Sequence, residues 1–162
     1  MAVLIEMDES APRDAHVHIT SRLIDSLYTE AMLLADEARS YFDACGRDDR
    51  LALDPVDRVG FSCESLKVTT RLMHVIAWLL TQRAVEAGEL SRAQAGDTER
   101  RLGEAPQTDE VLLQRLPDSA VSLIRSSEEL YDRVSRLDHG HFGTAPTGSP
   151  VRSLLSRLER SL

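Results

Sequence analysis

The sequence predicts an all-α protein, and three observations lead to this prediction. Aromatic residues make up only 4% of the 162 residues, whereas Leu, Ala, Arg and Glu are abundant and favour helix over sheet. Apolar residues recur every three or four positions, and no segment alternates with the period of two that marks a strand. Glycine or proline stands at the ends of these periodic segments. We expect a three- to four-helix bundle around one long central helix, with a short extra helix and a flexible C-terminal tail.

The length fits one domain with tails. A chain of this size buries roughly 70% of its unfolded surface, so it needs no disulfide or metal to fold. We expect residues 1–17 to be poorly ordered, residues 18–139 to form the bundle, and residues 140–162 to form a linker and tail. Cys45 and Cys63 belong to no CxxC unit, so we interpret them as reduced, partly buried thiols.

The first helix is predicted to begin at a cap on Thr20 or Ser21 and to end before Gly46. Residues 47–53 follow as a charged loop. One face of this helix carries seven residues at helical spacing: Leu23, Leu27, Ala31, Leu34, Ala38, Tyr41 and Cys45.

The central helix should begin at Asp54-Pro55 and stop at Gly88, with a length of about 48 Å. Its first apolar stripe consists of Val59, Cys63, Leu66, Thr70, Met73, Ala77, Leu80 and Ala84. We expect this stripe to form the core seam. A second apolar stripe beside it carries Phe61, Leu72, Ile76 and Leu79, and Val68 and Val75 widen the apolar arc further. A helix with so wide an apolar arc is predicted to have neighbours on several sides.

Three shorter segments complete the expected bundle. Ser91 and Gln94 form a capping box for a short helix that ends near Gly103. Residues 109–116 supply a helical turn or two. The last large helix covers residues 118–137, and we interpret its leucines at seven-residue spacing as core rather than as a free coiled coil. Residues 138–150 are expected to be a linker, because Gly, Pro, Ser and Thr are frequent there.

The segment from Pro150 to Leu162 is amphipathic at helical spacing. Its apolar face consists of Val151, Leu154, Leu155, Leu158 and Leu162. Three arginines and one glutamate give residues 144–162 a net charge of +2 and leave −10 for the rest of the chain. The segment either frays in water, docks back on the bundle, presents its leucines to a partner groove, or touches a membrane weakly. For the partner-binding alternative, the candidate residues are Val151, Arg152, Leu154, Leu155, Arg157 and Leu158.

Composition and motifs argue against several functions. The net charge of −8 disfavours nucleic-acid binding, which depends on Lys and Arg. The longest apolar run, residues 72–80, is far shorter than the ~20 residues of a membrane helix, and no signal peptide is recognisable, so we expect a cytoplasmic protein. Phosphate-binding glycine motifs and a serine elbow are missing. The pairs His16/His18 and His139/His141 lack further ligands. We therefore expect no enzyme, no cofactor and no metal.

The central helix also carries a polar cluster on the arc opposite the expected core seam: Glu64, Lys67, Arg71, Trp78 and Gln82. Trp78 is either covered by neighbouring helices, with its indole N–H bonded to a polar group, or an interface anchor. His74 is interpreted as a core or border histidine rather than a pH switch. A deep polar pocket around Arg71 and Gln82 would instead favour a small-ligand protein.

The run ESLKVTTRLMHVIAWLLTQRAVEAGELS, residues 64–91, carries a resemblance to a known family. It resembles the alphaproteobacterial regulator of CtrA degradation (RcdA) family, long filed as a domain of unknown function. The matching residues are Glu64, Ser65, Thr69, Thr70, Arg71, Leu72, Met73, Trp78, Gln82 and Arg83. The resemblance continues more loosely through LYTEAMLLADEARSYFD and SEELYDRVSRLD, and spans roughly residues 20–138.

The resemblance implies a non-enzymatic adaptor in regulated proteolysis, which helps to deliver cell-cycle regulators to a Clp-type AAA+ protease. The implied partners are factors of the protease complex and a substrate regulator, and a homodimer is left open. Glu64, Arg71, Trp78, Gln82 and Arg83 mark the family and are the candidate interface on the bundle. The alternative is a dimeric scaffold of the same family that is not linked to proteolysis.

Overall fold

The computed structural model describes the backbone of residues 11–142 and the side chains of residues 21–142. Three long helices dominate it: α1 (Ala11–Ser40), α3 (Pro55–Glu86) and α6 (Asp118–Phe142). Between them lie the short helices α2 (Arg47–Leu51), α4 (Arg92–Ala95) and α5 (Glu110–Leu113). A π-helical turn at Tyr41–Cys45 follows α1, and a 3₁₀ turn at Thr98–Arg100 follows α4. The described residues contain no strand, which confirms the all-α prediction.

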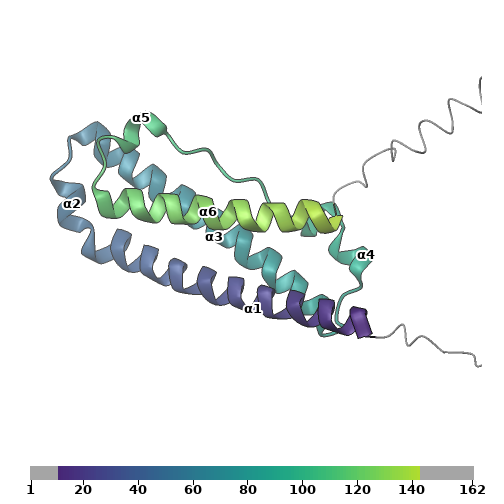
Figure 1. The fold of residues 1–162 in the computed structure, drawn as a ribbon. Coiled ribbons are helices and arrows are strands. Elements are labelled where there is room, and N and C mark those ends of the chain that lie inside the picture. Colours follow the sequence, from purple (N-terminus) through teal and green to yellow (C-terminus); the bar gives the residue numbers. More distant parts are fainter. Residues whose placement is uncertain (1–10, 143–162) are drawn as a thin grey trace, which may run out of the picture.

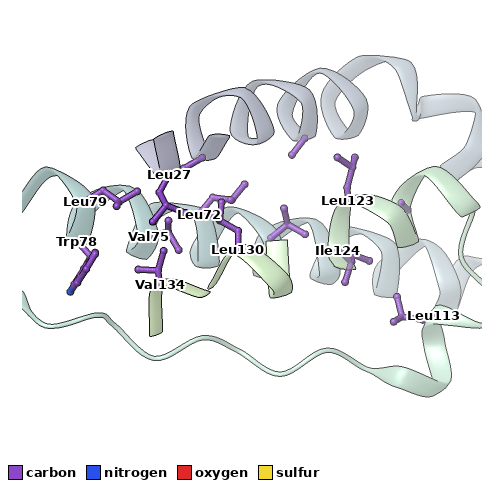
Figure 2. Close-up of a cluster of buried hydrophobic side chains, with 14 of the residues drawn as sticks. Leu27, Leu72, Val75, Trp78, Leu79, Leu113, Leu123, Ile124, Leu130 and Val134 are labelled. Carbon is purple, nitrogen blue, oxygen red and sulfur yellow. The ribbon is translucent and has the colours of Figure 1, made fainter. Parts of the chain in front are cut away.

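The three long helices form the bundle, with α3 packed against both α1 and α6 (Figure 1). The helix α1 runs antiparallel to α3, and α6 ends beside α4. The close-up in Figure 2 shows Leu72, Val75 and Leu79 of α3 between Leu27 of α1 and the side chains of Leu130 and Val134 of α6. The core therefore lies between these helices, and α3 is central, as its wide apolar arc predicts.

Local signals place most of the helix ends. Pro55 begins α3, where a missing N–H costs nothing. Gly88 follows α3 with a φ of 76°, a conformation that suits glycine and closes the helix. The capping box at α4 is confirmed: Ser91 Oγ accepts from the Gln94 N–H at 3.1 Å, and the Gln94 side chain accepts from the Ser91 N–H at 2.9 Å.

Most of the charged loop expected at residues 47–53 is helical instead, since Arg47–Leu51 form α2. Three expected boundaries were wrong as well. The helix α1 begins at Ala11 rather than near residue 20; proline is compatible with a first helical turn. The cap predicted at Thr20 or Ser21 lies inside the helix. The short helix after Ser91 ends at Ala95 rather than near Gly103, with a 3₁₀ turn beyond it.

The third wrong boundary is the end of α6. The helix extends to Phe142, so the first residues of the predicted linker 138–150 are helical. Asp138 and the carbonyl of Phe142 both accept hydrogen bonds from Arg101. These contacts with a distant segment stabilise the last turn despite Gly140. The tail from Pro150 to Leu162 lies outside the described residues.

The leucines at seven-residue spacing are core residues, as predicted. Leu123 and Leu130 of α6 and Leu116, which precedes the helix, are buried and belong to the main cluster, and Leu137 packs against it. In α1 the predicted face is buried at Leu27, Ala31 and Ala38. At its N-terminal end Ile24 is buried instead of Leu23.

Candidate interaction surface

The largest difference from the sequence analysis concerns which side of α3 faces the core. The residues expected to form the core seam, from Val59 to Ala84, point to solvent, and we call them the outer stripe. Val59 is 64% exposed, Leu66 68%, Met73 64% and Leu80 46%. Cys63 and Ala77 are exposed as well. The core side instead carries Phe61, Glu64, Val68, Arg71, Leu72, Val75, Trp78 and Leu79. The seam prediction was therefore wrong.

The reason is that α3 is apolar on two opposite sides. Val59, Leu66, Met73 and Leu80 repeat every seven residues, with Cys63, Thr70 and Ala77 between them. This spacing is that of a helix–helix contact. The same helix buries three ionisable groups on its core side, Asp57, Glu64 and Arg71, and those groups have partners there. An unpaired charge is costly to bury, whereas a paired one is tolerated.

Arg71 is the centre of the first buried polar network. Its guanidinium donates to Thr108 Oγ1 at 2.7 Å, to the Pro106 carbonyl at 2.9 Å and to Ser127 Oγ at 3.3 Å. Glu128 Oε1 lies 3.9 Å away and accepts a hydrogen bond from Thr108. Arg71 thereby fastens the segment before α5 to both α3 and α6.

Glu64 lies about two helical turns before Arg71 in α3 and is fully buried. Its Oε1 accepts from Lys67 Nζ at 2.6 Å and from the backbone N–H of Asp109 at 3.2 Å. Its Oε2 is buried without a partner among the described residues. The carboxylate therefore holds the start of α5 against α3, where Gly60 gives the side chain of Leu112 room to approach.

Trp78 is 2% exposed, and its indole N–H donates to Asp138 Oδ1 at 2.8 Å. Arg101 binds the same carboxylate through Nε at 2.8 Å and Nη2 at 3.0 Å. Burial alone would raise the pKa of Asp138, but the hydrogen bonds from Arg101 and Trp78 outweigh it and hold the pKa below its ordinary value. We call Trp78, Asp138 and Arg101 the α6 clasp.

The remaining predicted bundle residues, Gln82 and Arg83, are partly buried. Arg83 pairs with Asp25 at 2.9 Å and lies over the ring of Tyr28, 4.3 Å from its centroid. Both contacts join α3 to α1. Three of the five candidate interface residues, Glu64, Arg71 and Trp78, are therefore buried and offer a partner no side-chain surface in the folded chain. Trp78 is covered by neighbouring helices, which is the first of the two alternatives given for it.

Two apolar grooves border the outer stripe. The first has a cavity of about 310 Å³ between α1 and α3, lined among others by Ala35, Phe42, Leu72, Met73 and Ile76. The second, about 350 Å³, is lined by residues of α3 and the α2 region: Arg50, Leu51, Arg58, Val59, Ser62, Cys63 and Leu66. Stripe and grooves together form a largely apolar surface beside α3, with Arg39 and Asp43 at the first groove and Arg50 and Arg58 at the second.

The other candidate groups have ordinary surroundings. His74 is partly buried against Gly103, and its Nδ1 has no hydrogen-bond partner among the described residues. Cys45 and Cys63 are free and exposed rather than partly buried. Among residues 21–142, whose side chains the structure describes, no cluster of three His, Cys, Asp or Glu side chains is arranged to hold a metal ion. No helix in the described part of the chain combines the length and apolarity that crossing a membrane requires.

Sequence reasoning missed Asp138, Arg101, Ser127 and Thr108. Asp138 lay in the predicted linker, and the partners of Arg71 come from a loop and from α6. No local pattern marks them, because each contact joins residues more than 30 positions apart.

Comparison with known proteins agrees with this fold. A family model described as "Protein of unknown function (DUF1465)" matches residues 15–162, so the match includes the tail segment. The solved structure of RcdA from Caulobacter crescentus CB15 is 35% identical, with a TM-score of 0.63, and the match covers 76% of this chain and 93% of that one. No curated protein matches the chain. The chain therefore belongs to the RcdA-like family of helical proteins that is described as DUF1465.

Proposed function

We propose that this protein is a non-enzymatic adaptor in regulated proteolysis. It would bind a cell-cycle regulator and factors of a Clp-type AAA+ protease, and so bring substrate and protease together. The proposal follows from the resemblance to the RcdA family, with which the family match and the 35% identity to RcdA agree. Its setting would be the cytoplasm, where such proteases act.

The observation that best supports a protein-binding role is the outer stripe. The positions on this side of α3 include no charged side chain between Val59 and Leu80. Interface cores are depleted of charge in the same way, and a long exposed apolar patch on a single chain usually marks an interaction site. A partner helix laid along α3 would bury the stripe and could insert a side chain into the groove beside Met73.

An adaptor needs two attachments, and the tail supplies the second in this proposal. Val151, Leu154, Leu155 and Leu158 would enter a groove on a protease factor, with Arg152 and Arg157 at its rim. Binding one partner through the bundle and another through the tail raises their effective concentration for each other, to about the millimolar range with a short flexible linker.

The test is reconstituted degradation of a candidate regulator by the purified protease and its factors, with and without this protein. We expect faster, saturable degradation. The double variant Leu66→Glu/Met73→Glu should lose the stimulation, because two carboxylates would be forced into an apolar contact. The matched control Leu33→Glu/Val111→Glu changes two residues that are 67% and 66% exposed on α1 and α5, and it should retain the stimulation. A chain ending at Phe142 should lose stimulation without losing stability.

No stimulation by the wild-type chain, with every other component active, would reject the adaptor role. Equal loss in both double variants would reject the outer stripe as the docking surface. The alternative is a homodimeric scaffold, for which the spacing of the outer stripe is also suited. Dissociation by Leu66→Glu/Met73→Glu in sedimentation, without any effect on degradation, would favour that alternative.

A further inference from the structure

We propose that the tail, residues 150–162, binds the outer stripe of its own chain when no partner holds it. The occupant is thus a segment of this protein, and the contact is between an amphipathic helix and an exposed helix face. The contact itself stands apart from the proposed function; only its regulatory consequence rests on that function.

The spacing of the residues in the outer stripe indicates that a helix would bind there. These residues advance by four and three positions in alternation from Val59 to Ala84, which is the register of one helix packed along another. From Val59 to Leu80 the stripe is about 32 Å long. The cavity of about 310 Å³ between α1 and α3 opens beside Met73, so it offers a place for one aliphatic side chain of such a helix.

The tail has the matching pattern. Val151, Leu154, Leu155, Leu158 and Leu162 share one face when the segment is helical, with Ser153, Ser156 and Arg160 opposite. Thirteen helical residues extend about 20 Å, which covers roughly two-thirds of the stripe. The net charges of +2 on residues 144–162 and −10 on the rest of the chain favour their approach.

The chain leaves the bundle at a place from which the stripe is within reach. Phe142 is bonded through its carbonyl to Arg101, which also binds Asp138 beside Trp78. The described chain therefore ends near the C-terminal half of α3. Residues 143–149 span up to about 23 Å when extended. Half the circumference of a helix with side chains is about 16–19 Å, so the tail can reach the outer side of α3 near Leu80.

Attachment to the same chain favours the tail over a free occupant. A short flexible linker gives an effective concentration of about the millimolar range, which a second copy does not match in a dilute solution. The leucines of the tail cannot contact α3 and a partner at once. Under the proposed function, engagement of the tail by a protease factor would therefore uncover the outer stripe for the substrate regulator.

A thiol reporter on the stripe tests this contact without any partner or protease. Ala77→Cys, combined with Cys63→Ser, places one thiol on the exposed stripe and leaves the exposed Cys45 as a reference in the same chain. Maleimide modification of both thiols is followed by mass spectrometry in three backgrounds: the full chain, the chain ending at Phe142, and the tail variant Leu154→Glu/Leu158→Glu. The matched control Ser153→Glu/Ser156→Glu adds the same charge to the opposite face of the tail.

We expect slow modification of the introduced stripe thiol in the full chain and in the serine control. If the tail covers the stripe for nine-tenths of the time, its removal or the leucine substitutions accelerate the reaction about tenfold, while Cys45 reacts at one rate throughout. Equal rates for the stripe thiol in all four chains would overturn the proposal. Protection that grows with protein concentration would also overturn it, because the occupant would then be a second copy. Neither result depends on whether the protein acts in proteolysis.

Discussion

The α6 clasp allows one prediction to be worked out quantitatively. In Asp138→Ala the carboxylate that joins Trp78, Arg101 and the end of α6 is removed. The indole N–H then has no acceptor in a buried site, and Arg101 loses both bonds of a bidentate pair. The last turn of α6 loses part of its attachment to the segment after α4.

The expected cost combines two terms. An unpaired buried N–H costs about 1–3 kcal/mol, and breaking a buried ion pair costs about 3–5 kcal/mol. Arg101 retains a quarter of its side-chain exposure, so water replaces part of what it loses. This exposure reduces the ion-pair term to about 1–2 kcal/mol. Together with about 1–2 kcal/mol for the N–H, we expect Asp138→Ala to lower the free energy of unfolding by about 3 kcal/mol. The exposed Asp132 on the same helix is the matched control, and its substitution by alanine should change stability by less than about 0.5 kcal/mol.

The assay is urea unfolding followed by circular dichroism, with Trp78 fluorescence as a second probe, because Trp78 is the one tryptophan in the chain. A double-mutant cycle with Trp78→Phe separates the indole bond from the ion pair. Asp138→Ala should cost about 1 kcal/mol less in the Trp78→Phe background. A coupling energy of zero would show that the bond between Trp78 and Asp138 contributes nothing. A cost no larger than that of Asp132→Ala would refute the clasp as a stabilising contact.

Two further predictions follow from the buried polar groups. The folded pKa of Asp138 lies below its ordinary value, so its stabilisation is present above the unfolded pKa of about 3.9 and is lost as pH falls through the folded value. The stability difference between wild type and Asp138→Ala should hold from neutral pH to about pH 5 and shrink in more acidic solution; an undiminished difference in strong acid would contradict this. Arg71→Ala should cost about 3–5 kcal/mol, because Thr108 and the Pro106 carbonyl lose a buried donor. Arg71→Met should lower the free energy of unfolding by less, since methionine fills the space. Both variants should speed hydrogen exchange in residues 103–109. Unchanged exchange there would show that Arg71 does not hold this segment.

The helices were predictable because their signals are local. Pro55 and Gly88 mark the ends of α3, and the capping box at Ser91 opens α4, as the structure confirms. The end of α6 was not predictable, because residues 138–142 carry glycine and two histidines and are stabilised by Arg101, which lies 37 residues before Asp138. Such a contact leaves no trace in the local sequence.

The orientation of α3 was predicted wrongly for a physical reason. Both of its apolar sides repeat with the helical period, so periodicity alone does not tell which one is buried. Glu64 and Arg71 suggested a solvent-facing side, since isolated charges avoid the core. Their partners come from a loop and from α6. Glu64 accepts from the Asp109 N–H, and Arg71 donates to Pro106, Thr108 and Ser127. Only the assembled bundle shows that these charges are paired.

The two sides of α3 also differ in what they contribute to the fold. The core side already packs against α1 and α6 and holds the segment before α5, so the bundle is complete without the outer stripe. Replacing Leu66 or Met73 by a polar residue should therefore leave the stability of the single chain nearly unchanged. The outer stripe consists of exposed, uncharged residues that do not stabilise the bundle, and their spacing is that of a helix–helix contact. These residues can gain stabilising contacts only when another segment covers them. For this reason we propose that contacts with a partner or with the tail form at the outer stripe rather than at the buried signature residues.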